Sequence, residues 1–396
     1  MKLAKNLADA LRRMPMLPAA AVFVSGVLFF DRFAIGQALL WTSFALYCLA
    51  AGVLWRRRVA RSCIAAALFL LGGVVWSLHG RTEKAEPEAV TKTTLHDIAA
   101  ERFSRLELNP ETAAAAGAIG TGDRSRMTPE LREAYSRSGV SHILAVSGLH
   151  IGIIFVLANA LFRVLTVLRH GQIAAWLAVL VPVWLYAAAS GFSPSVVRAA
   201  VMFSMLQLSL SLSSSYSSVN MLAAAAFAMV AFNPATLFDI SFQLSFIVVA
   251  AIVIFGVPLF GIVDRRNRVV RFLWDTFVVG AVSFVAAAPL VSHLFGRVSL
   301  AGVVVNPIVI LCAGVIVAVS VVWVLVPVAL LQPAAEWVLD FTTGIQNRVV
   351  TVLSGFDWMV VDIRLSAGAV LGIYAVLAAG AVVLVGSGKG EMTNRF

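Results

Sequence analysis

Apolar runs long enough to cross a membrane recur along this chain from Pro18 to the C-terminal region, and they constrain the fold more than any other feature. A transmembrane helix needs roughly 20 such residues, and we count about eleven runs of that kind. Hydrophobic residues make up 60% of the 396 positions and charged residues only 13%, a composition that excludes a soluble globular protein. The sequence therefore predicts an all-α, polytopic integral membrane protein with about 11 transmembrane helices.

The basic residues predict how these helices are oriented. The formal net charge is +10, and Lys and Arg cluster beside the first, second, fourth and eighth apolar runs. On our count of spans all of these clusters fall on one side, which the positive-inside rule makes cytoplasmic. The N-terminus is then cytoplasmic, and the same count places the C-terminus outside. The clusters are Lys2, Lys5, Arg12 and Arg13; Arg56, Arg57, Arg58 and Arg61; Arg163 and Arg169; and Arg265, Arg266, Arg268 and Arg271.

Polar stretches between the runs divide the chain into four regions. Residues 1–80 hold three transmembrane helices, and residues 81–140 form an extracytoplasmic linker with an amphipathic helical segment. Residues 141–331 form the transmembrane core, and residues 332–396 contain an interfacial helix, the last transmembrane helix and a short tail. The amphipathic segment repeats apolar residues at helical spacing, from Leu95 to Leu106. It is expected either to lie on the membrane surface or to pack against the spans.

Three local patterns give further expectations. Gly117, Gly120 and Gly122 resemble a phosphate-binding loop only superficially, because no strand precedes them and no GK[ST] follows. Thr128 precedes Pro129 and is expected to cap a short helix. The sequence NP at 306–307 interrupts an apolar run, and it predicts a kinked or discontinuous helix.

The stretch GVSHILAVSGLHIG, residues 139–152, brings polar groups into a membrane-length run, which is costly unless they find partners. Gly148 and Gly152 are four residues apart, so they share a helix face that lets another helix approach closely. Ser147 and His150 also share a face. A Ser–His hydrolase dyad is one reading of this pair, but no orienting acid lies nearby in the sequence. An interhelical hydrogen bond or the polar lining of a water-filled path is favoured.

Two later runs also carry polar groups. Arg198 lies about one turn into the sixth run, where it is either paired or hydrated inside the protein, or reaches back to the outer interface. At the outer end of the eighth run, Asp239 and Gln243 are four residues apart, and so are Ser241 and Ser245. Two polar strips on that run favour a lumen over simple helix packing. The three cysteines show no metal-binding spacing, so neither a metal site nor a disulfide framework is expected.

Four stretches, in order, resemble the ComEC family of bacterial competence proteins, membrane channels proposed to carry single-stranded DNA inward during natural transformation. The resemblance covers roughly residues 111–312, about half of the chain. The first stretch is the most specific of the four. The stretches are GDRSRMTPELREAYSRSGVSHILAVSGLHIG, SPSVVRAAVM, NPATLFDISFQLSFIVV and GRVSLAGVVVNPIVI.

This resemblance implies a multi-pass channel or translocase in the bacterial inner (plasma) membrane that takes up single-stranded DNA. The partners it implies are the DNA, the lipid bilayer, a separate DNA receptor, a helicase-like motor and an unlinked nuclease, together with formation of a homo-oligomer. A path for a polyanion needs basic or stacking contacts. The candidate residues are His142, Ser147, His150, Arg198, Asp239, Gln243 and Asn306 along the DNA path, Gly148 and Gly152 for helix packing, and Asp123 in the extracytoplasmic motif.

Departures from the family pattern leave alternatives open. Residues 81–109 are too few for a complete OB barrel of about five strands, and no HxHxDH-type cluster occurs in the sequence. No catalytic residue, cofactor or enzyme activity is therefore expected. Asp239 would repel phosphate, so we expect it to pair with Arg198. The competing hypothesis is a small-solute or lipid transporter on the same fold that has lost DNA handling.

Overall fold

The computed structural model describes residues 14–33, 37–53, 59–79, 94–144, 147–167, 171–211, 217–260, 262 and 267–386. Among these residues six helices are long and apolar enough to cross a membrane. Shorter apolar helices cover Leu39–Ala51, Ile173–Ala189 and Ser218–Phe232. The predicted all-α polytopic membrane protein is therefore confirmed. The six long segments are Ser62–His79, Gly148–Leu165, Ile240–Leu259, Arg268–Phe295, Ala301–Leu325 and Ala367–Leu384.

The chain divides into two compact units, which we describe separately. The first unit joins Met1–Ala89, Leu208–Phe246 and Val382–Phe396, and the second joins Val90–Gln207 and Ile247–Ala381. In the first unit the described helices are α2 (Met16–Arg32), α3 (Gln37–Val53), α4 (Val59–His79), α11 (Ser218–Phe232), the 3-10 helix η3 (Pro234–Phe238) and the first part of α12 (Ile240–Ala251).

Glycines set the packing of α2 against α4 in the first unit. A Cβ atom added at Gly26 would lie 2.1 Å from the carbonyl oxygen of Phe69, and one added at Gly72 would lie 2.3 Å from that of Phe23. Side chains are impossible at such distances, so the two backbones touch directly. The apolar core beside this contact contains Phe23, which also packs its ring on Phe227 with 4.8 Å between ring centroids.

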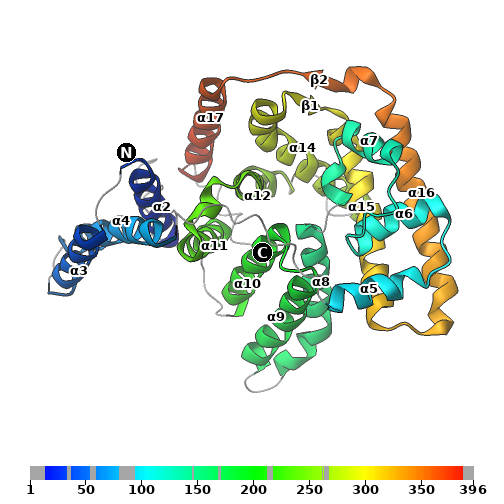
Figure 1. The fold of residues 1–396 in the computed structure, drawn as a ribbon, viewed down its shortest axis with the longest axis horizontal. Helices are drawn as coiled ribbons and strands as arrows, with labels where there is room; N and C mark the ends of the chain where they lie inside the picture. The colour runs from blue at the N-terminus through cyan, green and yellow to red at the C-terminus, as the bar shows by residue number, and fades with distance from the viewer. Residues whose placement is uncertain are drawn as a thin grey trace. The chain divides into compact units, whose positions relative to one another are not determined.

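The second unit holds the longest helices and the only sheet among the described residues (Figure 1). Its elements are α5 (Thr94–Ser104), α6 (Pro110–Gly120), α7 (Pro129–Arg137), η1 (Ser141–Leu144), α8 (Gly148–Phe162), η2 (Arg163–Val167), α9 (Gly171–Ala189), most of α10 (Pro194–Ser211), the π-helical turn η4 (Ile252–Gly256), α13 (Val257–Leu259), α14 (Arg268–Phe295), β1 (Arg297–Ser299), α15 (Ala301–Leu325), η5 (Ala329–Leu331), α16 (Gln332–Ser354), η6 (Asp357–Met359), β2 (Val360–Asp362) and most of α17 (Ala367–Gly386).

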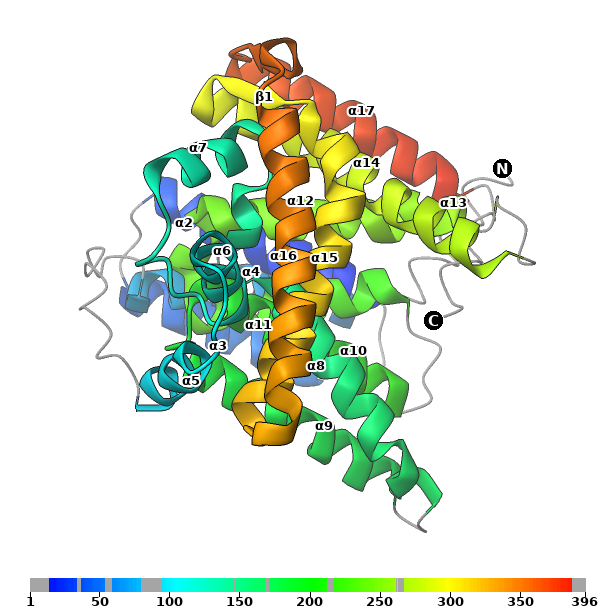
Figure 2. The same cartoon turned by 90° about the vertical axis from the view of Figure 1, so that its right-hand side faces the viewer.

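Helices α15 and α16 form an antiparallel pair and lie side by side (Figure 2). The strands that flank the pair are antiparallel, with Ser299 opposite Val360. Buried side chains from both ends of each helix join one apolar core, including Ala301 and Trp323 from α15 and Leu339 and Val350 from α16. The short helices α6 and α7 pack against the same pair and contribute most of their buried residues to the same core.

The structure decides several local expectations. The Thr128 hydroxyl accepts a hydrogen bond from the Leu131 N–H at 3.2 Å and caps α7, as predicted. The amphipathic segment is the helix α5, and it packs against a span, because Arg102 Nη1 donates to the carbonyl of Val324 at 2.6 Å. A discontinuity at Pro307 is absent, since α15 continues through it, whereas the other expectation, a kink, stays a prediction. Packed neighbouring helices hold such a helix together despite the one lost backbone bond.

Candidate functional site

The most specific stretch of the sequence begins α8 with a helix capping box. Ser147 is the N-cap residue, and its Oγ accepts a hydrogen bond from the Leu149 N–H at 3.3 Å. In return the Ser147 N–H donates to His150 Nδ1 at 3.1 Å. The histidine takes the position in which Glu or Gln usually completes this motif. The first four N–H groups of a helix have no partner within the helix, which is costly in a membrane, and this box satisfies two donors at the entry to a span.

The other ring nitrogen of His150 connects α8 to α6. His150 Nε2 hydrogen-bonds to the carbonyl oxygen of Ile119, in the last turn of α6, and the side chain is 1% exposed. An amide N–H only donates and a carbonyl only accepts, so Nδ1 is unprotonated and Nε2 carries the hydrogen. His150 is therefore a neutral imidazole with both nitrogens engaged, and it satisfies one of the free carbonyls at the end of α6.

This geometry bears directly on the hydrolase reading. Ser147 Oγ lies 3.2 Å from His150 Nδ1, which is within reach of proton transfer. However, Nδ1 already accepts a backbone N–H, and the group that orients the ring is the Ile119 carbonyl rather than a carboxylate. A catalytic triad needs an acid at that position to stabilise the imidazolium. The arrangement is that of a helix cap joined to a neighbouring helix.

The opposite end of α6 is bound by Asp340 of α16. Asp340 Oδ1 accepts the Asn109 N–H at 3.2 Å and also the hydroxyl of Thr112, and Asp340 Oδ2 lies 3.4 Å from Asn109 Nδ2. Asn109 is the N-cap residue of α6, yet its own side chain makes no capping bond. A carboxylate is well placed at a helix N-terminus because it meets free N–H groups and the positive end of the helix dipole.

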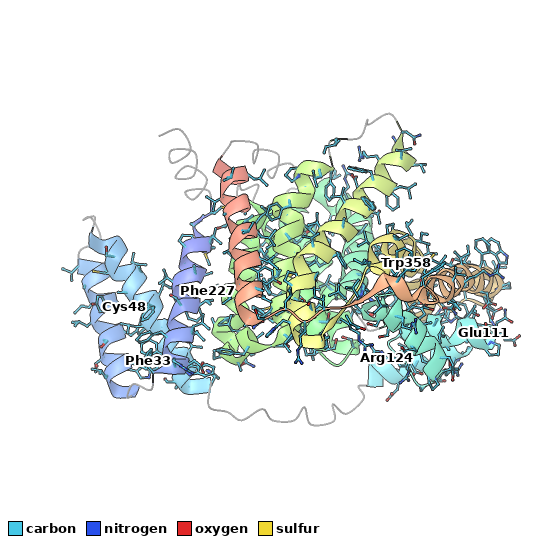
Figure 3. All side chains as sticks on the ribbon, turned by 90° about the horizontal axis from the view of Figure 1, so that it is seen from above. Phe33, Cys48, Glu111, Arg124, Phe227 and Trp358 are labelled. Carbon is cyan, nitrogen blue, oxygen red and sulfur yellow. The ribbon has the colours of Figure 1, made fainter. Side chains whose placement is uncertain are left out.

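Helix α6 is thus held at both ends by polar side chains of neighbouring helices, Asp340 at its N-terminus and His150 near its C-terminus. We call this arrangement the α6 clamp. Figure 3 labels Glu111, in the first turn of α6, and Arg124, in the turn that follows the helix. Arg124 Nε donates to the carbonyl of Leu144 at 2.8 Å, which ties this turn to the segment entering α8.

A second polar network joins α6, α7 and α16. The Tyr135 hydroxyl donates to Asn347 Oδ1 at 2.8 Å and accepts from Gln346 Nε2 at 2.9 Å. Asn347 Nδ2 continues the chain to the carbonyl of Glu111 at 3.1 Å. Burial raises the pKa of the Tyr135 phenol, although the bond from Gln346 opposes this shift. Tyr135 therefore remains a neutral donor, and a fully buried phenol of this kind needs such partners.

The C-terminal end of α6 also depends on a small residue. A Cβ atom at Gly120, the last residue of α6, would lie 2.4 Å from the Ser320 hydroxyl on α15. A Cβ atom at Gly117, one turn earlier, would make only ordinary contacts, the nearest at 3.7 Å. Gly120 therefore permits α6 to lie against α15, while Gly117 leaves more room.

The predicted packing glycines of α8 face α10. A Cβ atom added at Gly148 would lie 3.5 Å from Ala199 Cβ, and one added at Gly152 would lie 3.3 Å from the ring of Phe203. Arg198 precedes Ala199 in α10 and is buried, with 4% of the residue exposed. The His150 ring also stacks on Tyr186 of α9, with ring centroids 6.3 Å apart.

The remaining predicted residues are more dispersed. His142 lies in η1 with an exposed side chain. Asp123 Oδ1 accepts the Ser125 N–H at 2.9 Å in the turn after α6. Asn306 lies on α15 and faces α14, where a Cβ at Gly280 would be 3.5 Å from Asn306 Cβ. Its Oδ1 is buried and has no hydrogen-bond partner within the described residues.

Asp239 and Gln243 belong to the first unit, whereas Arg198 belongs to the second. Asp239 Oδ1 accepts the Ser241 N–H at 2.9 Å at the start of α12. Gln243 Nε2 donates to the carbonyl of Leu237 at 3.0 Å. Both contacts are local helix-end bonds, and the pairing of Asp239 with Arg198 stays a prediction.

The sequence analysis missed Thr112, Tyr135 and Asp340 as partners of the candidate site. The sequence predicts an interfacial helix around Asp340. Glu336, Asp340 and Asn347 are spaced by four and seven residues, so they share one polar face of α16. This polar face was the sequence signal that could have identified Asp340 as part of the site. Among the described residues no three His, Cys, Asp or Glu side chains are grouped to hold a metal ion.

Comparison with known proteins identifies the family. The model of the family described as Competence protein matches residues 119–386. A relative from Bacillus subtilis (strain 168), ComE operon protein 3, is 28% identical over 204 residues, which are 52% of this chain and 25% of that protein. No solved structure matches. The family match begins at Ile119, in the α6 clamp, and covers most of the second unit. The chain is a member of the Competence protein family.

Proposed function

We propose that this protein is an inner-membrane channel or translocase for the uptake of single-stranded DNA during natural transformation. Membership of the Competence protein family supports the process, and the membrane-crossing helices support the location. The single observation that carries the proposal is the α6 clamp: its His150 end lies in the matched stretch, and it places buried polar groups where α8 enters the membrane. Polar groups at such depth are retained at a cost, and they commonly mark a path for a polar substrate.

In this proposal the residues divide into two roles. Ser147 and His150 form the frame that positions the start of α8, because their polar atoms are already engaged within the protein. Arg198 contributes a buried positive charge, which attracts the phosphate backbone. Asp239, Gln243 and Asn306 are assigned to the wall of the path, and His142 and Asp123 to its outer side. The N-terminus is cytoplasmic. The proposed partners are DNA, a DNA receptor, a helicase-like motor, an unlinked nuclease and further copies of the chain.

The test is a deletion strain of a naturally transformable host that carries the gene. Surface-bound DNA and DNA protected inside the cell are measured separately with labelled duplex DNA. Deletion should abolish internalisation and leave surface binding intact. Complementation with Arg198→Ala should restore little uptake, Arg198→Lys should restore part of it, and Arg268→Ala, at the exposed first residue of α14, should restore it fully.

Wild-type transformation in the deletion strain would overturn the proposal. Accumulation of a small solute or lipid that depends on Arg198, together with normal transformation, would instead establish the transporter alternative. Labelling by a serine-reactive probe that is lost in Ser147→Ala would point to hydrolase chemistry. The proposal predicts no such labelling, because the Ser147 hydroxyl caps a helix.

A further inference from the structure

Helix α16 is not among the six described segments that are apolar enough to cross a membrane, and its sequence predicts an interfacial helix. Its length nevertheless matches its partner. Helix α15 has 25 residues and α16 has 23. At about 1.5 Å per residue they are roughly 37 and 34 Å long, and each exceeds the hydrocarbon thickness of about 30 Å.

The two ends of α16 are fixed at the two ends of α15. At one end, only residues 326–331 connect the helices. At the other end, the Leu300 N–H donates to the carbonyl of Met359 at 2.7 Å, and β1 pairs with β2. Figure 2 shows α16 running along α15 between these points. If α15 crosses the bilayer, then α16 returns through it to the side where α15 began.

The polar groups of α16, which lower its hydropathy, are mostly turned to protein partners. Glu336 Oε1 accepts the Glu107 N–H and Gln332 Nε2, both at 2.8 Å. Asp340 binds the start of α6, and Asn347 binds Tyr135 and Glu111. These partners replace the water that a membrane would exclude. Arg348 is exposed, and it lies less than two turns from the end of the helix, so its long side chain reaches the interface.

The opposite face of α16 is an exposed, largely apolar stripe that Arg348 interrupts between Ile345 and Val352. Its residues are Trp337, Phe341, Ile345 and Val352, which are 67%, 57%, 40% and 58% exposed. They repeat at spacings of four, four and seven, as one helix face requires. The rings of Trp337 and Phe341 are stacked with centroids 5.5 Å apart. On a helix long enough to cross the bilayer, such a stripe can pack against lipid acyl chains. Trp337, in the second turn of α16, would then lie near one membrane interface.

We propose that α16 crosses the membrane beside α15, with its apolar stripe against lipid acyl chains and its polar face covered by α6 and α7. The short helix α6, packed on both spans, then enters the membrane without crossing it. This inference concerns topology and lipid contact, and it goes beyond the proposed function. It holds or fails whether or not DNA is the substrate.

The first test locates the two ends of α16 by cysteine labelling. Cys48, Cys63 and Cys312 are replaced by alanine, and single cysteines are introduced as Leu330→Cys, Asp362→Cys and, as control, Arg297→Cys. A membrane-impermeant maleimide is added to intact spheroplasts and again after permeabilisation. Asp362→Cys and Arg297→Cys should react from one side and Leu330→Cys from the other. Reaction of Leu330→Cys and Asp362→Cys from the same side would overturn the crossing.

The second test asks what covers the stripe. A fluorophore on Phe341→Cys in proteoliposomes, in the same cysteine-free background, is challenged with nitroxide lipids of different depth and with aqueous iodide. Because Phe341 lies near the middle of α16, a nitroxide deep in the acyl chain should quench it most strongly. Stronger quenching by a shallow nitroxide would show an interfacial helix, and quenching by iodide would show a water-exposed one. Protection from all quenchers would show a protein partner or a second copy. Each of these three results contradicts the proposal.

Discussion

Helices pack in two different ways in the two units of this protein. In the first unit, α2 and α4 touch through bare backbone at Gly26 and Gly72, without polar side chains at that contact. In the second unit, α6 is held by buried polar side chains at both ends, from Asp340 and His150. Close contact between backbones needs only small residues, and it is sufficient for membrane helices to associate.

The difference supports the proposal that the α6 clamp serves the function of the protein. Polar groups inside a membrane protein are expensive, so a site that uses them where glycines would suffice has a further reason to do so. We attribute the polar construction of the α6 clamp to the need for a hydrated path beside it. The glycine contact of α2 and α4, by contrast, needs no explanation beyond packing.

The largest expected effect tests the glycine contact. Gly72→Ala places a Cβ atom against the carbonyl of Phe23, and backbone cannot move aside as a flexible side chain would. We expect the first unit to lose about 3 kcal/mol of stability in detergent, as measured by thermal unfolding of the purified protein. Gly314→Ala, where a Cβ meets nothing within 4 Å, is the matched control and should unfold like the wild type. Equal behaviour of the two variants would refute the contact.

The second effect tests the C-terminal end of the clamp. His150→Ala leaves the Ser147 N–H and the Ile119 carbonyl without partners in a buried position, and the expected loss is about 2–3 kcal/mol. His150→Gln should recover part of the loss, because an amide completes a capping box. His142→Ala, at an exposed histidine of the same stretch, should change stability little. The measurement is the unfolding temperature of each of the three variants. An unchanged unfolding temperature of His150→Ala would contradict the proposed role of His150 in the clamp.

The third effect concerns Asp340 at the N-terminal end. Asp340→Asn removes the charge that faces the start of α6 and replaces one acceptor by a donor, which should cost about 1–2 kcal/mol. Thr112→Val removes one partner of the same carboxylate. A double-mutant cycle should show coupling between these positions. Additive losses would mean that the two residues act independently and would contradict the clamp.

The smallest effect separates two glycines on one helix. Gly120→Ala meets the Ser320 hydroxyl and should cost about 1 kcal/mol, whereas Gly117→Ala should be neutral or slightly stabilising. Ser320→Ala should relieve part of the conflict in the Gly120→Ala background. If Gly117→Ala proved as harmful as Gly120→Ala, then general crowding around α6, rather than its contact with α15, would be the cause.

Much of the fold follows from the sequence, because hydropathy and helix caps are local signals. The apolar run that precedes Arg56 and the Thr128 cap both lead to the helices that the structure contains. At Pro307 the expected discontinuity does not occur, because packed neighbouring helices hold α15 together.

The candidate site was predictable only in part. The spacing of Ser147 and His150 showed that they share a helix face, and the absence of a nearby acid argued against a triad. The partners of His150 and Thr112 lie 31 and 228 residues away along the chain, at Ile119 and Asp340. Such pairs depend on tertiary packing, which a periodicity of a few residues does not encode.

The most direct test of the central claim is DNA internalisation by cells that carry His150→Ala, His150→Gln or Ser147→Ala, corrected for the amount of protein in the membrane. The claim is that His150 supports the uptake path by holding α6 to α8. It predicts that His150→Ala internalises little DNA, that His150→Gln retains part of the activity, and that Ser147→Ala retains most of it, because His150 still accepts the residue 147 N–H. Wild-type uptake by His150→Ala at a normal protein level would contradict the claim.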